Sequence, residues 1–412
     1  MEILSSTKEH LKIGNYNFYV IMIKKIVLEK IYIIVTIIII GGYSAINMLA
    51  TEHNSVYTTE DPLLMKLLVG MLFFMTSCYV IVHRKSNIQS PTCRILLFIS
   101  IYMAIWRIID LPTAAGILSY IYQPMRDLLI VVLFLFGNLL VAKSDDLRDY
   151  FTTGMIIALI ISAIYYYKNW AFANETDQAH LGTSYYALFL LPTILLTPKK
   201  WIKYVAIIIV GVIIISSFKR GGSIALVLGL VSYLFVKEVL LEHKITKLIW
   251  FLVLIFILLI TLYYIDNAMG NIISGRLLNI VEDGGSGRDQ VWATTWNMIC
   301  TSDIEELTFG HGFNAVMEDS PQQLSAHNDF LEVLYNYGLI CFIPYIMLHI
   351  HLTKQLIQSI RQKNTVAPVM VFTYTIFICL SLISHIIVYP WSIFIALSWG
   401  LQSDTSIKDT NA

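Results

Sequence analysis

Two residues of one polar stretch, Arg288 and His327, have side chains suited to binding a phosphate and to removing a proton. Arginine stays charged at physiological pH and grips phosphate oxygens with two parallel N–H groups. A neutral histidine accepts a proton near pH 7, as a general base must. Each residue also has a structural interpretation: Arg288 pairs with a nearby acid such as Asp289, and His327 bonds a neighbouring carbonyl. For a single histidine the structural role is the commoner one.

A cationic corner, Lys219-Arg220, lies between two apolar runs and is followed by Gly221-Gly222. Glycines leave the backbone N–H groups open to an anion, and a helix N-terminus favours negative charge. We therefore predict that Lys219 and Arg220 form an anion-binding corner, with snorkelling to the interface as the alternative.

Four further residues are candidates to contact a substrate: Arg126, His311, Asn328 and His180. Arg126 and Arg107 lie at or within helix ends, where an ionisable group either serves function or snorkels to the interface. Arg107 is predicted to pair with Asp110, three residues on. The aromatic run after His180 either stacks on sugars or belongs to the interfacial aromatic belt, and the belt is favoured. No outward cluster suits a divalent cation, so no metal and no other cofactor is predicted.

The elements that must position these residues are membrane helices. The chain of 412 residues is 57% hydrophobic and 14% charged, with a mean hydropathy of +0.69. Soluble domains carry about a quarter charged residues, so this is an all-α integral membrane protein with a single polytopic domain over 1–412. About twelve spans are predicted, near 31–50, 63–83, 95–109, 125–142, 151–168, 184–197, 202–218, 222–237, 247–265, 328–352, 366–384 and 386–401.

The distribution of positive charge predicts the topology. Of the 28 Lys and Arg residues, 20 fall on one side of these spans and eight on the other. Cytoplasmic loops are enriched in Lys and Arg, so both termini are predicted to be cytoplasmic. The segment 266–327 is then one large extracytoplasmic loop, with nine acidic residues, two arginines and no lysine. No basic stripe suggests nucleic acid as a partner.

Two helix starts are predicted to set the height of the candidate residues in the membrane. Ser286 resembles an N-cap, with Asp289 three residues on, and Trp292 and Trp296 follow on one face of an interface-lying helix. The second helix starts near Ser325 or Ala326, which puts His327 at a positive dipole end that disfavours its protonation. Arg288 and His327 would then lie at membrane-surface height, where a lipid-linked phosphate sits.

Several motifs of the chain resemble those of the O-antigen ligase and O-antigen polymerase superfamily. They are Ser-Gly-Arg-(x)3-Trp at 286–292, Phe-Gly-His-Gly-Phe at 309–313, Ala-His-Asn-Asp-Phe-Leu with Tyr-Gly-Leu at 326–339, and the Lys-Arg-Gly corner at 219–221. The count of about twelve spans and one large late loop resemble the family too. Many members have Ser-Arg-Gly at the corner, which leaves open whether Lys219 shares the phosphate contact.

The resemblance implies a membrane-embedded glycosyltransferase of the bacterial inner membrane, with its active site on the periplasmic side. Its donor would be an undecaprenyl-diphosphate-linked glycan, and its acceptor either lipid A core or a second lipid-linked glycan. Arg220 and Arg288 would bind the diphosphate, and His327 would activate the acceptor hydroxyl. A single base and no carboxylate nucleophile indicate direct displacement with inversion, and two arginines replace a metal at the leaving group.

A secondary transporter or lipid-linked glycan flippase is the alternative, since twelve spans suit it equally well. Such proteins show internal repeats with matching midplane charges or helix breaks, and this chain shows no such symmetry. Convergence of Arg220, Arg288 and His327 on one cavity would favour the enzyme. Between ligase, polymerase and protein glycosyltransferase the sequence does not choose, although no extra C-terminal domain follows residue 401, which disfavours the last.

Overall fold

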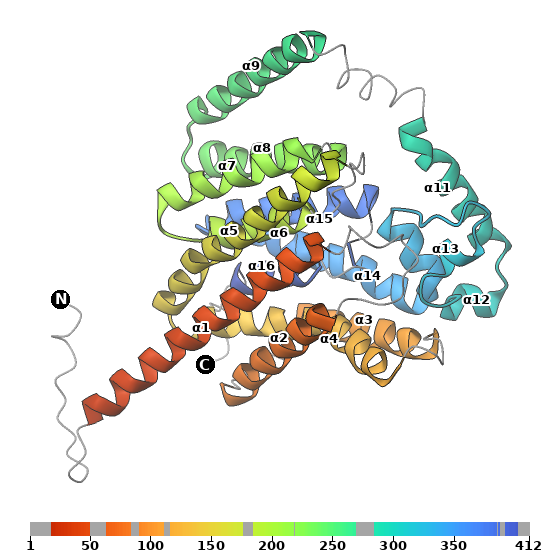
Figure 1. Ribbon diagram of the computed structural model, residues 1–412, viewed down its shortest axis with the longest axis horizontal. Helices are drawn as coiled ribbons and strands as arrows, with labels where there is room; N and C mark the ends of the chain where they lie inside the picture. The colour runs from red at the N-terminus through yellow and green to blue at the C-terminus, as the bar shows by residue number, and fades with distance from the viewer. Residues whose placement is uncertain are drawn as a thin grey trace.

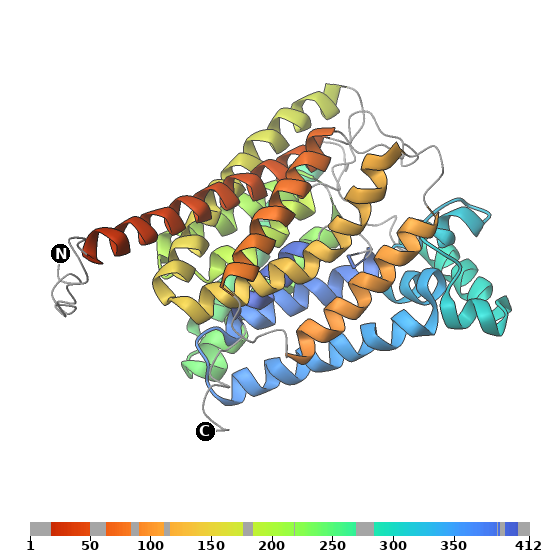
Figure 2. The ribbon, with the colours of Figure 1, turned by 90° about the horizontal axis from the view of Figure 1, so that it is seen from below.

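The computed structural model describes residues 18–49, 63–83, 90–110, 116–175, 184–217, 219–268, 284–384, 386–387 and 392–402. Within these ranges the chain is helical and contains no strand. The main helices run roughly along one direction and form a bundle (Figures 1 and 2). The first nine elements are α1 (Phe18–Leu49), α2 (Leu63–Val82), α3 (Pro91–Asp110), α4 (Gly116–Lys143), α5 (Asp145–Glu175), α6 (Ser184–Leu195), α7 (Lys200–Ser216), α8 (Arg220–Leu234) and the π-helix η4 (Phe235–Leu241).

The second part of the chain adds α9 (Thr246–Ala268), α11 (Gly284–Thr301), α12 (Ile304–Phe309), α13 (Ala315–Asp319), α14 (Asp329–Arg361), α15 (Ala367–Ile383) and α16 (Ser392–Gln402). A helix coincides with each of the twelve predicted spans. Seven helices are long and apolar enough to cross a membrane, and four more segments are shorter apolar helices. An all-α membrane fold is confirmed, whereas the number of twelve spans stays a prediction.

Outward-facing apolar side chains and close helix contacts both suit a lipid environment. Large residues such as Phe74, Ile208 and Phe256 are more than 60% exposed, as expected where lipid replaces water. Helices α4 and α16 approach closely through small residues: a Cβ on Gly137 would lie 2.7 Å from the carbonyl oxygen of Leu397, and Gly400 packs on the backbone of Phe134. Glycine at a helix contact lets two backbones pack directly, which is a common way for membrane helices to associate.

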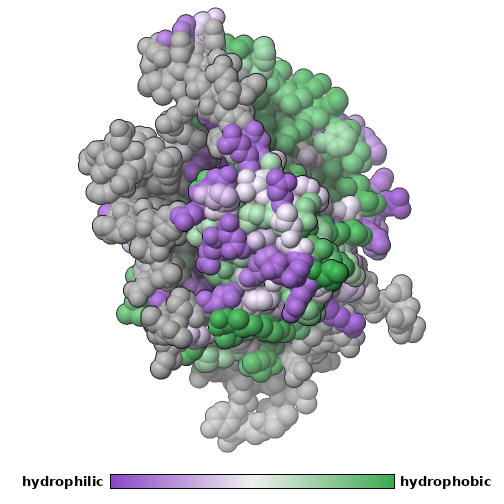
Figure 3. Space-filling view, turned by 90° about the vertical axis from the view of Figure 1, so that its right-hand side faces the viewer, coloured by the Kyte–Doolittle hydropathy of each residue, from purple (hydrophilic) through white to green (hydrophobic). Residues whose placement is uncertain are grey.

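The short helices α11, α12 and α13 gather at one end of the bundle, beside the start of α14 (Figures 1 and 2). Viewed from that end, hydrophilic residues gather near the centre of the face, with apolar residues at its upper right and below it (Figure 3). Exposed side chains of these helices include Asp289, Asp303, Glu305 and Glu318. The predicted polar segment therefore contains folded helices packed on the membrane bundle. Its assignment as an extracytoplasmic loop stays a prediction.

Candidate functional site

Helix α11 carries Arg288 in its first turns. The helix begins at Gly284, so the prediction of Ser286 as N-cap is wrong. Glycines 284 and 285 have no side chain to terminate a helix, and helical backbone angles are open to them at some cost in entropy. Arg288 is half-buried, and one turn later the Trp292 indole donates a 2.8 Å hydrogen bond to the Ala326 carbonyl oxygen. This bond ties α11 to the segment that carries His327.

The cationic corner forms the start of α8. Lys219 is the N-cap residue and Arg220 the first helical residue, and both are half-buried. Burial, and then the positive charge of Arg288, lower the pKa of Lys219. Like charges are costly to bring together away from water, so Lys219 and Arg288 together make a place where an anion would be stabilised.

The buried ring of Tyr185, on α6, covers the two glycines that follow the corner. A Cβ on Gly222 would lie 3.0 Å from this ring, and one on Gly221 would lie 3.2 Å from its hydroxyl oxygen. Arg288 also acts electrostatically on this hydroxyl. Tyr185 thus packs on the start of α8 and is within electrostatic reach of Arg288.

His327 precedes α14 rather than lying in it. The N-cap is Asn328, whose side-chain oxygen accepts from the backbone N–H groups of Phe330 and Leu331 at 3.0 and 3.3 Å. The predicted start at Ser325 or Ala326 is therefore wrong, because an asparagine closer to the apolar run satisfies these donors. His327 has a left-handed backbone, with φ of +50°. Its N–H donates to the buried Glu332 carboxylate at 2.9 Å, which fixes that conformation.

The end of α15 joins the His327 segment to the cationic corner. The Asn328 side chain donates to the Leu382 carbonyl oxygen at 3.2 Å. The next residue, Ile383, lies 2.7 Å from where a Cβ on Gly221 would be. Together with the contacts of Trp292 and Arg288, this path brings the regions of all three predicted residues to one end of the bundle.

A buried carboxylate fixes the other side of this segment. Asp329 is fully buried and accepts hydrogen bonds from the backbone N–H groups of Ile386 and Ile387, at 2.7 and 3.1 Å. The Tyr345 hydroxyl donates to it at 3.3 Å. The first residue of α14 is therefore held by the segment after α15, and His327 lies two positions before it.

The turn 309–313 packs backbone to backbone on α14. The N–H groups of His311 and Gly312 donate to the carbonyl oxygens of Tyr335 and Asn336 at 3.1 and 2.9 Å. The His311 ring stacks on Tyr335 at 3.9 Å between centroids, and its Nε2 lies 3.3 Å from Glu306. His311, a candidate to contact substrate, has the surroundings of a residue that positions this turn.

The predicted pair of Arg107 with Asp110 is wrong. Arg107 pairs with Asp127 of α4 at 2.7 Å, in a buried setting, and its guanidinium lies 3.9 Å from the centre of the Phe313 ring. Asp110 accepts the Phe313 N–H. Arg107 points into the bundle, where its carboxylate partner comes from the next helix. Arg126 acts electrostatically on the same Asp127 and lies 5.9 Å from the Tyr122 ring.

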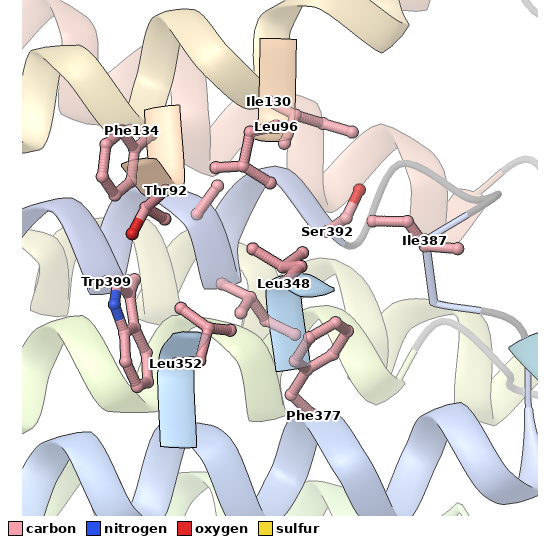
Figure 4. A pocket seen from close by; sticks show the side chains of 12 residues that line it. Thr92, Leu96, Ile130, Phe134, Leu348, Leu352, Phe377, Ile387, Ser392 and Trp399 are labelled. Atoms are coloured by element: carbon pink, nitrogen blue, oxygen red, sulfur yellow. The ribbon is translucent and has the colours of Figure 1, made fainter. Parts of the chain in front are cut away.

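A small cavity between α3, α4, α14, α15 and α16 has no part in this site. Its volume is about 30 Å³, roughly one water molecule. Figure 4 shows its wall, with Leu96, Leu348 and Phe377 among the side chains that point into it. A cavity of this size without a charged wall does not suit a diphosphate. His180, the remaining candidate, lies outside the described residues.

Residues 205–346 match the family model described as O-antigen ligase. The matched stretch contains the cationic corner, α11 and the His327 segment, so the resemblance to the O-antigen ligase and polymerase superfamily is confirmed. A search of curated proteins finds no match to this chain. The apolar helices indicate a multi-pass membrane protein, and the match to the O-antigen ligase model suggests glycosyltransferase-like activity.

Sequence reasoning missed the roles of Tyr185 and Asp329. Tyr185 belongs to an aromatic run that also suits an interfacial belt, and Asp329 suits a helix start in any case. Nothing in their local sequence indicates that Tyr185 packs on Gly221 or that Asp329 accepts a hydrogen bond from Ile386. Only the contact of distant segments reveals these roles.

Proposed function

We propose that this protein transfers a glycan from undecaprenyl diphosphate to an acceptor hydroxyl on the periplasmic side of the inner membrane. The observation that carries the proposal is the approach of Arg288 to Lys219 at the start of α8, with Trp292 bonded beside His327. A cation of α11 thus acts on a cation at the N-terminus of α8, and α11 is bonded to the residue before His327. A leaving diphosphate and an attacking hydroxyl need these groups.

In this proposal Arg220, Arg288 and Lys219 bind the diphosphate. Negative charge develops on the oxygen between the anomeric carbon and phosphorus as the carbon–oxygen bond breaks. Fixed cations stabilise this charge without proton transfer to the leaving group. Arginine adds the two-pronged geometry that a lysine lacks. Because Lys219 and Arg288 repel one another, their repulsion destabilises the ligand-free folded protein, and a bound diphosphate dianion offsets this repulsion.

His327 is proposed as the base that takes the acceptor proton while the new bond forms. Such a base contributes about 10²–10⁴-fold to the rate. With no carboxylate proposed as nucleophile, the anomeric centre inverts in one displacement. The cations supply the charge stabilisation at the leaving group, so we predict that excess chelator leaves the rate unchanged.

The test uses purified protein, lipid-linked glycan and lipid A core. His327→Ala and Arg288→Lys should each lower transfer by at least about 10²-fold, the lower range for a lost base or charge donor. His327→Asn tolerates a left-handed backbone, so it separates loss of the base from loss of the turn. His243→Asn and Arg94→Lys, at exposed positions elsewhere, are the matched controls. Near-normal transfer by His327→Asn would refute the role of His327 as the base. Near-normal transfer by Arg288→Lys would refute the contact of Arg288 with the diphosphate.

The acceptor is decided by gene deletion and analysis of the lipopolysaccharide. Loss of all attached glycan, with lipid-linked polymer accumulating, identifies a ligase. A single attached repeat identifies a polymerase. Lipid-linked glycan held on the cytoplasmic side would instead support the flippase alternative.

A further inference from the structure

A second cluster of cations surrounds a larger cavity, far from the candidate site. The cavity has a volume of about 410 Å³, and its wall includes Arg148, Lys203, Lys237 and Lys363, with Glu242 as an acidic group. Lys237 follows Arg220 by seventeen residues along α8 and η4, a helical distance of about 25 Å. The cavity therefore lies near the opposite end of the bundle, the end predicted to be cytoplasmic.

Two cations near this cavity each lie close to two acidic groups. Arg148 lies 3.1 Å from Asp145 and 3.2 Å from Asp149. Lys247 bonds the buried Glu238 at 2.9 Å and lies 4.0 Å from Glu242.

Three lysines on the wall remain without such a partner. In the part of the chain that the structure describes, Lys203, Lys237 and Lys363 form no ion pair within 4 Å. The charges of Lys237 and Lys200 act unfavourably on the charged form of Lys203, and that of Asp149 partly offsets them. Lysines that repel one another around a cavity are stabilised when an anion enters it.

Two helix N-termini add to this positive field. Helix α7 begins at Lys200, two residues after the wall residue Pro198, and α15 begins at Ala367, directly after the wall residues Thr365 and Val366. Neither N-cap residue makes a side-chain capping bond. The positive ends of both helix dipoles therefore meet the cavity, and helix N-termini favour phosphate groups.

We propose that this cavity binds a phosphate group, supplied by the headgroup of an anionic phospholipid. The wall also contains Leu195, Leu196 and Val369, apolar residues suited to the first part of an acyl chain. Basic pockets between membrane helices on the cytoplasmic side are suited to anionic headgroups. The proposal is separate from glycosyl transfer and does not depend on it.

The test measures binding to delipidated, full-length protein in detergent by native mass spectrometry. Its probes are dioctanoyl phosphatidylglycerol, dioctanoyl phosphatidylcholine and inorganic phosphate. Lys203→Gln with Lys237→Gln should weaken phosphatidylglycerol binding about tenfold or more, since each nearby cation contributes on the order of 1 kcal/mol and 1.4 kcal/mol is tenfold. Lys244→Gln with Lys354→Gln removes the same charge at exposed positions outside the cavity and should change binding less than about twofold.

Three outcomes would overturn the proposal. Equal loss in both double variants would show general surface attraction, and equal binding of phosphatidylcholine would show that the headgroup charge is not recognised. Inorganic phosphate that binds as tightly as phosphatidylglycerol would overturn the lipid as source. Lys237→Arg keeps the positive charge and should bind phosphatidylglycerol normally, so it distinguishes loss of the site from a folding defect. A well-folded Lys237→Gln variant should bind phosphatidylglycerol weakly.

Discussion

Replacing Gly338 with alanine is a direct test of how the turn 309–313 is held on α14. Gly338 has φ of 64° and ψ of −174° and breaks α14 into two helical parts. This region of backbone space is open essentially to glycine, and a side chain there costs about 1–3 kcal/mol. An added Cβ would also lie 2.5 Å from the backbone nitrogen of Gly310 and would overlap the Thr308 carbonyl oxygen.

The backbone strain and the overlap with Gly310 and Thr308 both involve backbone atoms that have little freedom to move. The free energy of unfolding should therefore fall by about 3 kcal/mol or more. At about 2 °C per kcal/mol for a large chain, the thermal midpoint in detergent should fall by roughly 6 °C. Glycan transfer should fall with it, because the turn carries the contacts of His311 and Phe313 with α14 and α3.

The matched control is Gly211→Ala in α7, where a Cβ meets nothing within 4 Å. In a helix this change is neutral or stabilises by roughly 0.5–1 kcal/mol. Thermal midpoints and transfer rates are measured for both variants side by side. Equal midpoints for the two would refute the argument that Gly338 is required by backbone packing.

Two other substitutions test the buried charges. Asp127→Asn removes the carboxylate that pairs with the buried Arg107 and should lower the free energy of unfolding by about 3–5 kcal/mol, measured by chemical unfolding. Arg107→Leu with Asp127→Leu should recover most of this loss, and no recovery would contradict the assignment. Lys219→Met should raise the thermal midpoint of the ligand-free protein at pH 7 and weaken donor binding. Folding lowers the pKa of Lys219 from 10.5. The charged form of Lys219 therefore destabilises the folded protein at any pH below its pKa in the folded state. This destabilisation fades as the pH rises from that pKa toward 10.5, where the side chain is losing its charge in both states. The gain from Lys219→Met should shrink over the same range, and a gain that grows with pH would contradict the reasoning.

The residues proposed for the chemistry are recognisable from the sequence. They are cations or a base on the side that the sequence predicts to be poor in cations, namely Arg288, Lys219-Arg220 and His327. Their motifs lie within the stretch that matches the O-antigen ligase model. Their immediate surroundings are harder to predict. Asn328, rather than Ser325, caps α14, because capping depends on which side chain reaches two particular N–H groups.

The membrane character of this protein and the positions of its helices follow from the sequence by itself. Hydropathy is a local property, and twenty apolar residues predict a helix whatever their neighbours. The meeting of Arg288 with Lys219, of Arg107 with Asp127 and of Asn328 with Leu382 is decided only by the tertiary structure. These contacts join segments far apart in the chain, and their formation depends on the direction in which each packed helix points its side chains. The cavity around Lys203 and Lys237 is of the same kind, since no single segment contains it.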